Sequence, residues 1–265
     1  MPAADRRAQL LPRSDVPTWR RTLRYYLARL VVSAFMRLLF DVRLEGREHL
    51  ARRPAIYCFG HGSWTDPFVL MTVLPLRPRL FFFGPKEEDM TTGGRNRLMH
   101  WTGTTVPFKP GKNDLLDGTR RVGAVLDSGA VLAISGEGRL HAREREVLPL
   151  REGAAFFALR SRVPIIPVAI NGNSWLRPRG VIRVRVGAPI TAPIQADLRP
   201  MRQRVAAVTG TVESALRSMV ADAAERGASR GAFCRLTELF NDWGDGTPEA
   251  AERARQRAAA RRDKT

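Results

Sequence analysis

The residues best suited to acid–base chemistry lie in the stretch 60–66, GHGSWTD. His61 is one of four histidines and lies between two glycines, and Asp66 follows five positions later. An imidazole titrates near neutral pH, so it can take a proton from a hydroxyl group while a carboxylate holds its other ring nitrogen. His61 is therefore the candidate general base, and Asp66 is its candidate orienting partner.

The spacing of this pair restricts where each residue can lie. On a regular helix an offset of five places two side chains about 140° apart, so they would not meet. They can meet if His61 lies on a loop and Asp66 begins the helix behind it. Asp66 before Pro67 fits an N-cap followed by a first-position proline, whereas Ser63 with Asp66 fits a capping box that begins the helix three residues earlier. Both registers stay open, as does the simpler interpretation that Asp66 only caps a helix.

A second polar cluster follows the apolar run at 130–134. Glu137, Gly138 and Arg139 come directly after this predicted buried strand, at the strand end where α/β proteins build their sites. His141 is expected on a surface loop.

These motifs resemble those of the glycerolipid acyltransferase family, whose best-known members are the 1-acylglycerol-3-phosphate acyltransferases. That family carries an N-H-x-S-x-x-D box, a middle block ending in arginine, an E-G-T-R block and a V-P-I-x-P-V strand. The matching positions are His61, Ser63, Asp66, Glu137, Gly138, Arg139 and the strand at 163–168. The resemblance covers residues from about 40 to 190, with the motifs in the right order.

The resemblance implies an acyl transfer. The His61–Asp66 pair would activate an acceptor hydroxyl group, which attacks the thioester of acyl-CoA or an acyl-carrier protein. Ser63, Glu137, Gly138, Arg139 and Lys109 would bind the acceptor, a lysophospholipid in phospholipid biosynthesis. Arg139 would hold its phosphate end, because an arginine can form two parallel charge-assisted hydrogen bonds to a phosphate group, and Glu137 could position Arg139 or a glycerol hydroxyl group. The family needs no metal and no tightly held cofactor, so none is expected.

The chain departs from the family pattern at three places. Gly60 replaces the usual asparagine, and SGEGRL lacks the proline and the threonine of the E-G-T-R block, so the arginine comes one position early. Lys109 stands where an arginine is expected in the middle block, and a lysine is a point charge rather than a planar fork. Lysophosphatidate is the family's usual acceptor, but another hydroxyl lipid or an amine stays open.

Apolar runs that alternate with helical patterns predict the elements that position these residues. The pattern indicates an α/β fold: a single layered domain at 41–245 with a mostly buried mixed sheet flanked by helices. Strands are predicted near 40–46, 54–59, 79–84, 104–108, 130–134, 163–170 and 180–187. Helices are predicted near 67–74, 112–129, 151–162, 197–222 and 229–241.

Residues 1–40 are predicted to form a tail and an amphipathic helix at the membrane interface. The segment 17–40 is apolar but interrupted by arginines, and its longest charge-free run, 30–36, is far shorter than the ~20 residues needed to span a bilayer. Trp19 and two tyrosines near the first turn are typical of an interfacial anchor, although a helix docked on the domain is the alternative. The tail at 246–265 is basic and is expected to be disordered.

The composition of the chain restricts the kinds of partner that we expect. A net charge of +18 and an isoelectric point near 11.4 favour an anionic membrane surface or a phosphorylated substrate. The two cysteines form no disulfide framework and no metal site, so we expect an intracellular protein. The donor and acceptor that the resemblance implies are both amphiphiles that partition into lipid, so we expect the protein to be peripheral on the cytoplasmic face of the cell membrane. The alternative is a non-enzymatic basic protein that binds anionic membrane or nucleic acid, although no recognised nucleic-acid-binding motif appears.

Overall fold

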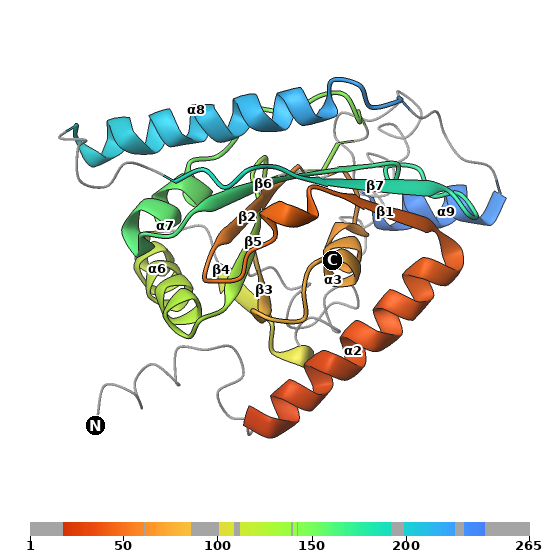
Figure 1. Ribbon diagram of the computed structural model, residues 1–265, viewed down its shortest axis with the longest axis horizontal. Coiled ribbons are helices and arrows are strands. Elements are labelled where there is room, and N and C mark those ends of the chain that lie inside the picture. The colour runs from red at the N-terminus through yellow and green to blue at the C-terminus, as the bar shows by residue number, and fades with distance from the viewer. Residues whose placement is uncertain are drawn as a thin grey trace, which may run out of the picture.

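The computed structural model of the protein describes residues 18–60, 62–85, 101–108, 112–138, 140–141, 143–191, 199–225 and 231–241. Its centre is a seven-stranded sheet in the order β1-β7-β6-β2-β5-β3-β4 (Figure 1). The strands are β1 Asp41–Glu45, β2 Ile56–Phe59, β3 Leu80–Pro85, β4 Thr105–Phe108, β5 Val131–Ser135, β6 Ile165–Asn171 and β7 Val181–Val186. Neighbouring strands are parallel except for the antiparallel pair β6–β7. The predicted mixed sheet is therefore confirmed.

Helices cover both faces of the sheet. They are α2 Thr18–Leu39, α3 Asp66–Val73, α6 Lys112–Asp127, α7 Gly153–Ser161, α8 Met201–Val220 and α9 Gly231–Phe240, with a short 3-10 turn η1 at Arg47–His49. Helices α6, α7 and α8 lie on one side, and α2, α3 and α9 lie on the other (Figure 1). The predicted α/β architecture, flanked by helices and begun by an N-terminal helix, is confirmed.

The strands at the centre are buried on both faces, which explains why they are continuous apolar runs in the sequence. In β2, Ile56 and Cys58 belong to the core beneath α6, α7 and α8, while Tyr57 and Phe59 belong to the core beneath α2 and α3. Strand β7 alternates between buried and half-buried positions, as its valine–arginine pattern predicts, although β1 and β6 pair with it on both sides.

Helix α2 docks on the domain through one face. Arg29 is buried and donates hydrogen bonds to the carbonyl oxygens of Leu74 and Pro75, and Arg37 donates one to the carbonyl of Thr72. These carbonyls lie at the carboxyl end of α3, where a helix carries partial negative charge. Two of the arginines that interrupt the apolar segment therefore join α2 to α3.

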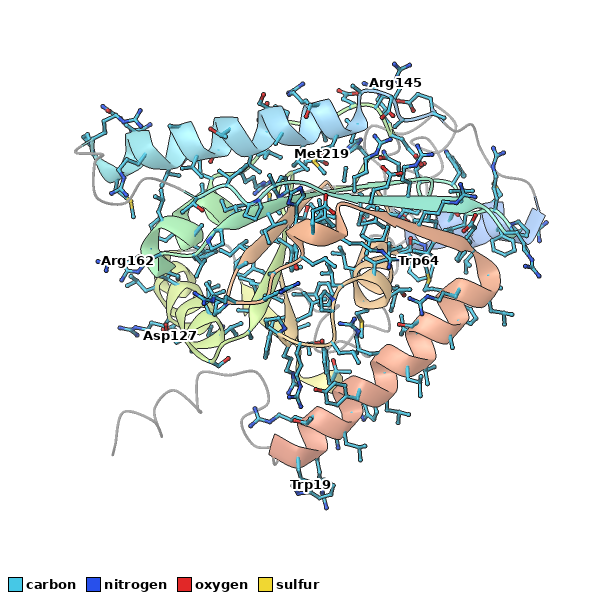
Figure 2. The ribbon with its side chains drawn as sticks, viewed as in Figure 1. Trp19, Trp64, Asp127, Arg145, Arg162 and Met219 are labelled. Carbon is cyan, nitrogen blue, oxygen red and sulfur yellow. The ribbon has the colours of Figure 1, made fainter. Side chains whose placement is uncertain are left out.

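The opposite face of α2 is exposed and apolar. Figure 2 shows Trp19 projecting from the first turn. The exposed large apolar side chains of this face are Trp19, Leu23, Leu27, Leu30, Val31, Phe35 and Leu38. No helix in the described part of the chain is both long and apolar enough to cross a bilayer. The predicted tails at 1–17 and 246–265 lie outside the described residues.

Candidate active site

Three loops meet at the carboxyl ends of β2, β5 and β6, which are neighbouring parallel strands. The first loop follows Phe59 and leads into α3. The second begins at Gly136, and the third follows Asn171. Because parallel strands end at the same edge of a sheet, the two clusters that the sequence singles out come together here, as expected for this type of fold.

The first loop holds Asp66 in a tight turn. Helix α3 begins at Asp66, with Thr65 at the N-cap position and Pro67 in the first turn. The backbone N–H of Ser63 donates to Oδ2 of Asp66 at 3.1 Å, and the N–H of Asp66 donates to the carbonyl of Ser63 at 3.1 Å. The N-cap, Thr65, thus lies between the two predicted N-caps, Ser63 and Asp66, and one of the two bonds of a capping box forms between Ser63 and Asp66.

Asn173 supplies the second support of Asp66. Its side-chain Nδ2 donates to Oδ1 of Asp66 at 2.6 Å and to Oγ1 of Thr65 at 3.1 Å. Asp66 and Asn173 are both buried, with 0% and 1% of their surface exposed. Each oxygen of the Asp66 carboxylate therefore accepts an N–H bond, which fixes its orientation at the amino end of α3, where negative charge is favoured.

The second loop buries an ion pair. Nε2 of His141 lies 2.8 Å from Oε2 of Glu137, and the two side chains are 5% and 0% exposed. The expectation that His141 lies on a surface loop is therefore wrong. The chain turns sharply at Gly138, where φ is +68°, and His141 returns onto Glu137. Gly138 is exposed, and a Cβ atom there would lie 2.5 Å from Nε of Arg151, so a larger residue would be strained at this positive φ and would have to displace the Arg151 side chain.

The environment favours a protonated His141. Burial alone would lower the pKa of the imidazole, but the hydrogen bond and charge of Glu137, with smaller effects of Glu146 and Asp66, raise the pKa above its ordinary value. Nδ1 of His141 is buried and has no hydrogen-bond partner within the described residues. The loop therefore carries a buried imidazole that is more often cationic near neutral pH than a free histidine is.

Gly60 and Gly62 bring the backbone of the first loop close to polar groups of the second and third loops. A Cβ atom at Gly60 would lie 3.5 Å from Oε1 of Glu137, and one at Gly62 would lie 3.7 Å from the carbonyl oxygen of His141 and 4.0 Å from Oδ1 of Asn173. The backbone on both sides of position 61 thus faces these polar groups. A cavity of about 30 Å³ lies among them. The distance at Gly60 is an ordinary van der Waals contact, so the structure has room for a side chain at this position, where the family usually has asparagine.

The sequence analysis did not identify Asn173, nor the hydrogen bonds to Glu144 that hold the loop on which Asn173 lies. The carboxylate of Glu144 accepts hydrogen bonds from the backbone N–H groups of Gly172 and Ser174 and from the Ser174 hydroxyl group. Asn171 Nδ2 donates to the carbonyl of Glu144 at 2.9 Å. Their position in the sequence could have indicated a role, because Asn171 and Asn173 come just after the predicted buried strand at 163–170, as Glu137 comes just after the one at 130–134.

An apolar cavity of about 200 Å³ lies beside the Asp66 turn, between α2, α3 and α9. Trp64 and Thr65 of the turn form part of its wall, and the N–H of Trp64 donates to Oδ1 of Asn241 at 2.8 Å, which attaches the turn to the end of α9. Its other lining residues are Val31, Val32, Phe35, Met36, Leu39, Phe40, Phe68, Leu176, Phe233 and Leu236. An apolar chain can therefore lie next to the polar site.

The structure brings together Ser63, Asp66, Glu137 and Gly138 of the predicted site residues. His61, Lys109 and Arg139 lie outside the described residues, so the predicted contact between His61 and Asp66 and the predicted phosphate ligands stay predictions. Among the residues that the structure describes, no group of three or more histidine, cysteine or acidic side chains could hold a metal ion.

Comparison with known proteins agrees with this geometry. The family model described as acyltransferase matches residues 41–171, which contain the loops after β2 and β5 and all of β6. The chain is 27% identical over 160 residues to the 1-acyl-sn-glycerol-3-phosphate acyltransferase of Saccharomyces cerevisiae, and 25% identical over 165 residues to that of Limnanthes douglasii. These matches cover 57% and 59% of this chain and 52% and 55% of the relatives, so the chain spans about half the length of each.

A solved structure shares the fold. The crystal structure of the 1-acyl-sn-glycerophosphate acyltransferase of Thermotoga maritima superposes with a TM-score of 0.59 and 20% identity, and the match covers 82% of this chain and 88% of that one. At this identity the likeness concerns the fold alone. Taken with the family-model match and the arrangement of the motifs, it shows that residues 41–171 of this chain resemble the acyltransferase family in sequence and in fold.

Proposed function

We propose that this protein is a peripheral membrane O-acyltransferase, which moves a fatty acyl group to the hydroxyl group of a lysophospholipid in phospholipid biosynthesis. The proposed donor is acyl-CoA or an acyl-carrier protein, and the first acceptor to test is 1-acylglycerol-3-phosphate. The observation that carries the proposal is the fixed carboxylate of Asp66. It is buried, held by Ser63 and Asn173, and located five residues after His61, which is the second residue after β2 in the sequence.

The proposed reaction uses His61 as the general base. Its imidazole takes the proton of the acceptor hydroxyl group, and the oxygen attacks the carbonyl carbon of the thioester. The carbon–sulfur bond then breaks, and the thiolate leaves with the proton that His61 returns. Asp66 holds the other ring nitrogen, so that the ring keeps one tautomer and one orientation. The donor is a substrate, and we propose no resident metal or cofactor.

The proposed acceptor site lies around the loop after β5. Arg139, with Lys109, would hold the phosphate group of the acceptor, while Ser63 and Gly138 would line the approach to the hydroxyl group. Glu137 would position the neighbouring groups of this loop, since its carboxylate is buried against His141. Charge supports this location: protonated His141 offsets the negative charge of the Glu137 carboxylate, so the loop does not repel a phosphate nearby.

The proposed acyl site is the apolar cavity between α2, α3 and α9. Its wall includes Trp64 and Thr65, so it adjoins the turn that orients Asp66. A fatty acyl chain would remove apolar surface from water there, at ~25 cal/mol per Å². Helix α2, which lines this cavity, also carries the exposed apolar face. Such a face fits a location on the cytoplasmic face of the cell membrane, where both substrates partition into lipid.

The test measures thiol release. Purified protein with acyl-CoA and lysophosphatidate is expected to release free CoA and to form a radiolabelled diacyl product. His61→Ala should abolish both without changing the unfolding midpoint. The matched control is His49→Ala, at the 3-10 turn η1, which should keep full activity.

A panel of acceptors identifies the substrate class. Lysophosphatidate, lysophosphatidylcholine, glycerol 3-phosphate and a long-chain amine are each offered with acyl-CoA and with acyl-carrier protein. Product with none of them, together with tight binding to anionic vesicles or nucleic acid that survives His61→Ala, would favour the non-enzymatic alternative.

A further inference from the structure

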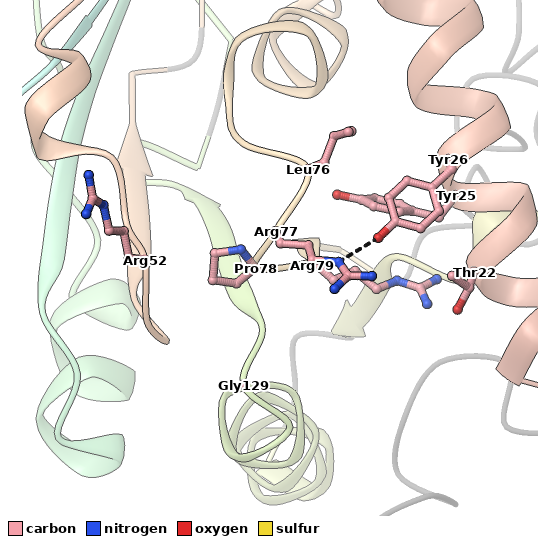
Figure 3. Close-up of a pocket in the computed structure, with 9 residues that line it drawn as sticks. All are labelled: Thr22, Tyr25, Tyr26, Arg52, Leu76, Arg77, Pro78, Arg79 and Gly129. Atoms are coloured by element: carbon pink, nitrogen blue, oxygen red, sulfur yellow. Dashed lines mark hydrogen bonds between the residues drawn. The ribbon is translucent and has the colours of Figure 1, made fainter.

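A second polar cavity lies at the opposite edge of the sheet from the candidate active site. Arg52 precedes β2, Arg79 precedes β3 and Gly129 precedes β5, and all three line a cavity of about 530 Å³ (Figure 3). Because these strands are parallel, this is their amino edge. Strands of four to six residues at ~3.3 Å per residue separate the two edges by roughly 13–20 Å.

Three arginines line the cavity. Within the described part of the chain, Arg52, Arg77 and Arg79 form no ion pair with an acidic residue. Arg77 Nε donates to the hydroxyl group of Tyr26 at 3.1 Å, the bond drawn in Figure 3. Three guanidinium groups around one cavity create a positive potential that attracts an anion.

Of the three arginines, Arg79 makes the most contacts with the rest of the protein. Its Nη2 donates to the carbonyl oxygens of Thr102 at 2.8 Å and Arg21 at 3.4 Å, and its guanidinium lies 5.0 Å from the ring of Tyr25. Burial lowers the pKa of Arg79, and the charge of Arg21 lowers it further. Nε of Arg79 is buried without a hydrogen-bond partner among the described residues. A bound anion would offset both the desolvation and the repulsion.

The cavity adjoins an apolar surface. Tyr26 and Thr22 of α2 line it, and at about 100° per residue they lie next to Trp19, Leu23 and Leu30 on the helix circumference. Those three side chains are 63%, 60% and 69% exposed, and Leu76 on the cavity wall is 52% exposed. An anion bound here would therefore lie beside a surface that suits acyl chains, which favours the headgroup of a lipid over a free anion.

We propose that the cavity lined by Arg52, Arg77 and Arg79 binds the terminal phosphate headgroup of an anionic phospholipid, at a site separate from the catalytic one. A terminal phosphate can enter a recessed cavity and offer several unesterified oxygens to guanidinium groups, whereas a phosphodiester is flanked by esterified groups on both sides. The inference rests on the proposed membrane location but not on the acyl-transfer chemistry.

The experiment measures binding of the full chain to vesicles by sedimentation. Phosphatidylcholine vesicles contain either phosphatidate or phosphatidylglycerol, at contents that give equal zeta potentials. The wild type is expected to bind the phosphatidate vesicles at least 5-fold more tightly. The pocket variant Arg52→Gln/Arg77→Gln should bind both kinds equally. The matched control Arg20→Gln/Arg24→Gln removes the same charge from the first turns of α2 and should weaken both, with the preference preserved.

Other outcomes would overturn the proposal. Equal binding of both vesicles by the wild type, or loss of the preference in the control variant as well, would mean that only general charge attraction operates. A stabilisation of the wild type by glycerol 3-phosphate without any vesicle preference would assign the site to soluble phosphates instead. If the double variant fails to fold, Arg52→Gln alone gives the same comparison, because Arg52 is exposed and makes no hydrogen bond within the described residues.

An activity measurement separates this site from the proposed function. With short-chain, water-soluble substrates, the pocket variant should transfer acyl groups at the wild-type rate. Absence of transfer in the wild type would contradict the proposed function and leave the vesicle comparison intact.

Discussion

Nδ2 of Asn173 lies 2.6 Å from Oδ1 of Asp66, although 107 residues separate them in the chain. The bond joins the loop after β6 to the first residue of α3. Because Asp66 is fully buried, its charge depends on such donors for stabilisation. Asn173 is therefore the residue through which the third loop positions the carboxylate of the His-x4-Asp motif.

Replacing Asn173 tests this positioning role. Asn173→Ala is expected to lower the free energy of unfolding by about 2–3 kcal/mol, because a buried charge loses a hydrogen-bond donor. It should also reduce kcat by about 10- to 100-fold with little change in KM, because a misplaced base slows the chemical step. Urea unfolding and steady-state kinetics measure the two effects.

The matched control for this prediction is Asn171→Ala. Asn171 is also buried at the end of β6 but donates to a neutral backbone carbonyl, that of Glu144. It should cost about 1 kcal/mol and leave kcat nearly unchanged. Equal kinetic effects of the two variants would contradict a specific role of Asn173.

The pair of His141 and Glu137 predicts a pH-dependent stability. The pKa of His141 is raised in the folded chain, so folding favours the protonated ring. This contribution is complete below the ordinary pKa of ~6.5 and is lost as the pH rises through the folded value. The difference in unfolding free energy between the wild type and His141→Gln should therefore be largest near pH 6 and shrink towards pH 9.

His49→Gln is the control for this pH series. His49 is half-exposed and lies 3.6 Å from an exposed carboxylate, that of Glu48. Its replacement should change stability little at any pH, since surface ion pairs contribute little. A His141 difference that grows with pH would show that the ring is buried neutral.

The two thiols should react at very different rates. Cys58 is 1% exposed, and its pKa is raised to about 12, first by burial and then by the charge of Glu137. Cys234 on α9 is half-buried. Native protein should therefore react quickly with one equivalent of a thiol reagent at Cys234, and with the second only after unfolding, because the thiolate is the reactive form.

Cys234→Ser is the matched variant for this labelling. It should show no fast labelling and should serve as the background-free enzyme for the thiol-release assay. Fast reaction of two thiols in the native wild type would mean that the loop beside Cys58 opens readily.

The sequence predicts the sheet well because buried parallel strands are continuous apolar runs, and turns separate them clearly. It also predicts that the loops carrying Asp66 and Glu137 lie at the same edge of the sheet, because both follow strands whose carboxyl ends share that edge. It could not reveal that Asn173 bonds to Asp66, since that contact depends on the relative position of two loops. Nor could it place His141, whose burial depends on the left-handed turn at Gly138.

Filling the apolar cavity should change chain-length preference. Val32 is 8% exposed and lines the cavity, so Val32→Phe adds volume where space exists. We expect a thermal midpoint that is unchanged or higher, because filling a cavity stabilises a fold. The ratio of rates with a long-chain and a short-chain acyl-CoA should fall at least 5-fold, whereas Val32→Ile should alter it little. An unchanged ratio in Val32→Phe would place the acyl chain elsewhere.

The exposed face of α2 predicts membrane binding that can be removed without loss of the fold. Leu23 and Leu30 are 60% and 69% exposed, so Leu23→Gln/Leu30→Gln should leave the unfolding midpoint unchanged. Each leucine that enters a bilayer interface contributes about 1.5–3 kcal/mol at full burial, so the double variant should bind vesicles at least 10-fold more weakly. Leu116→Gln on α6, equally exposed at 65%, is the control and should bind as the wild type does. An equal loss in the control, or none in the α2 variant, would show that this face does not meet the membrane.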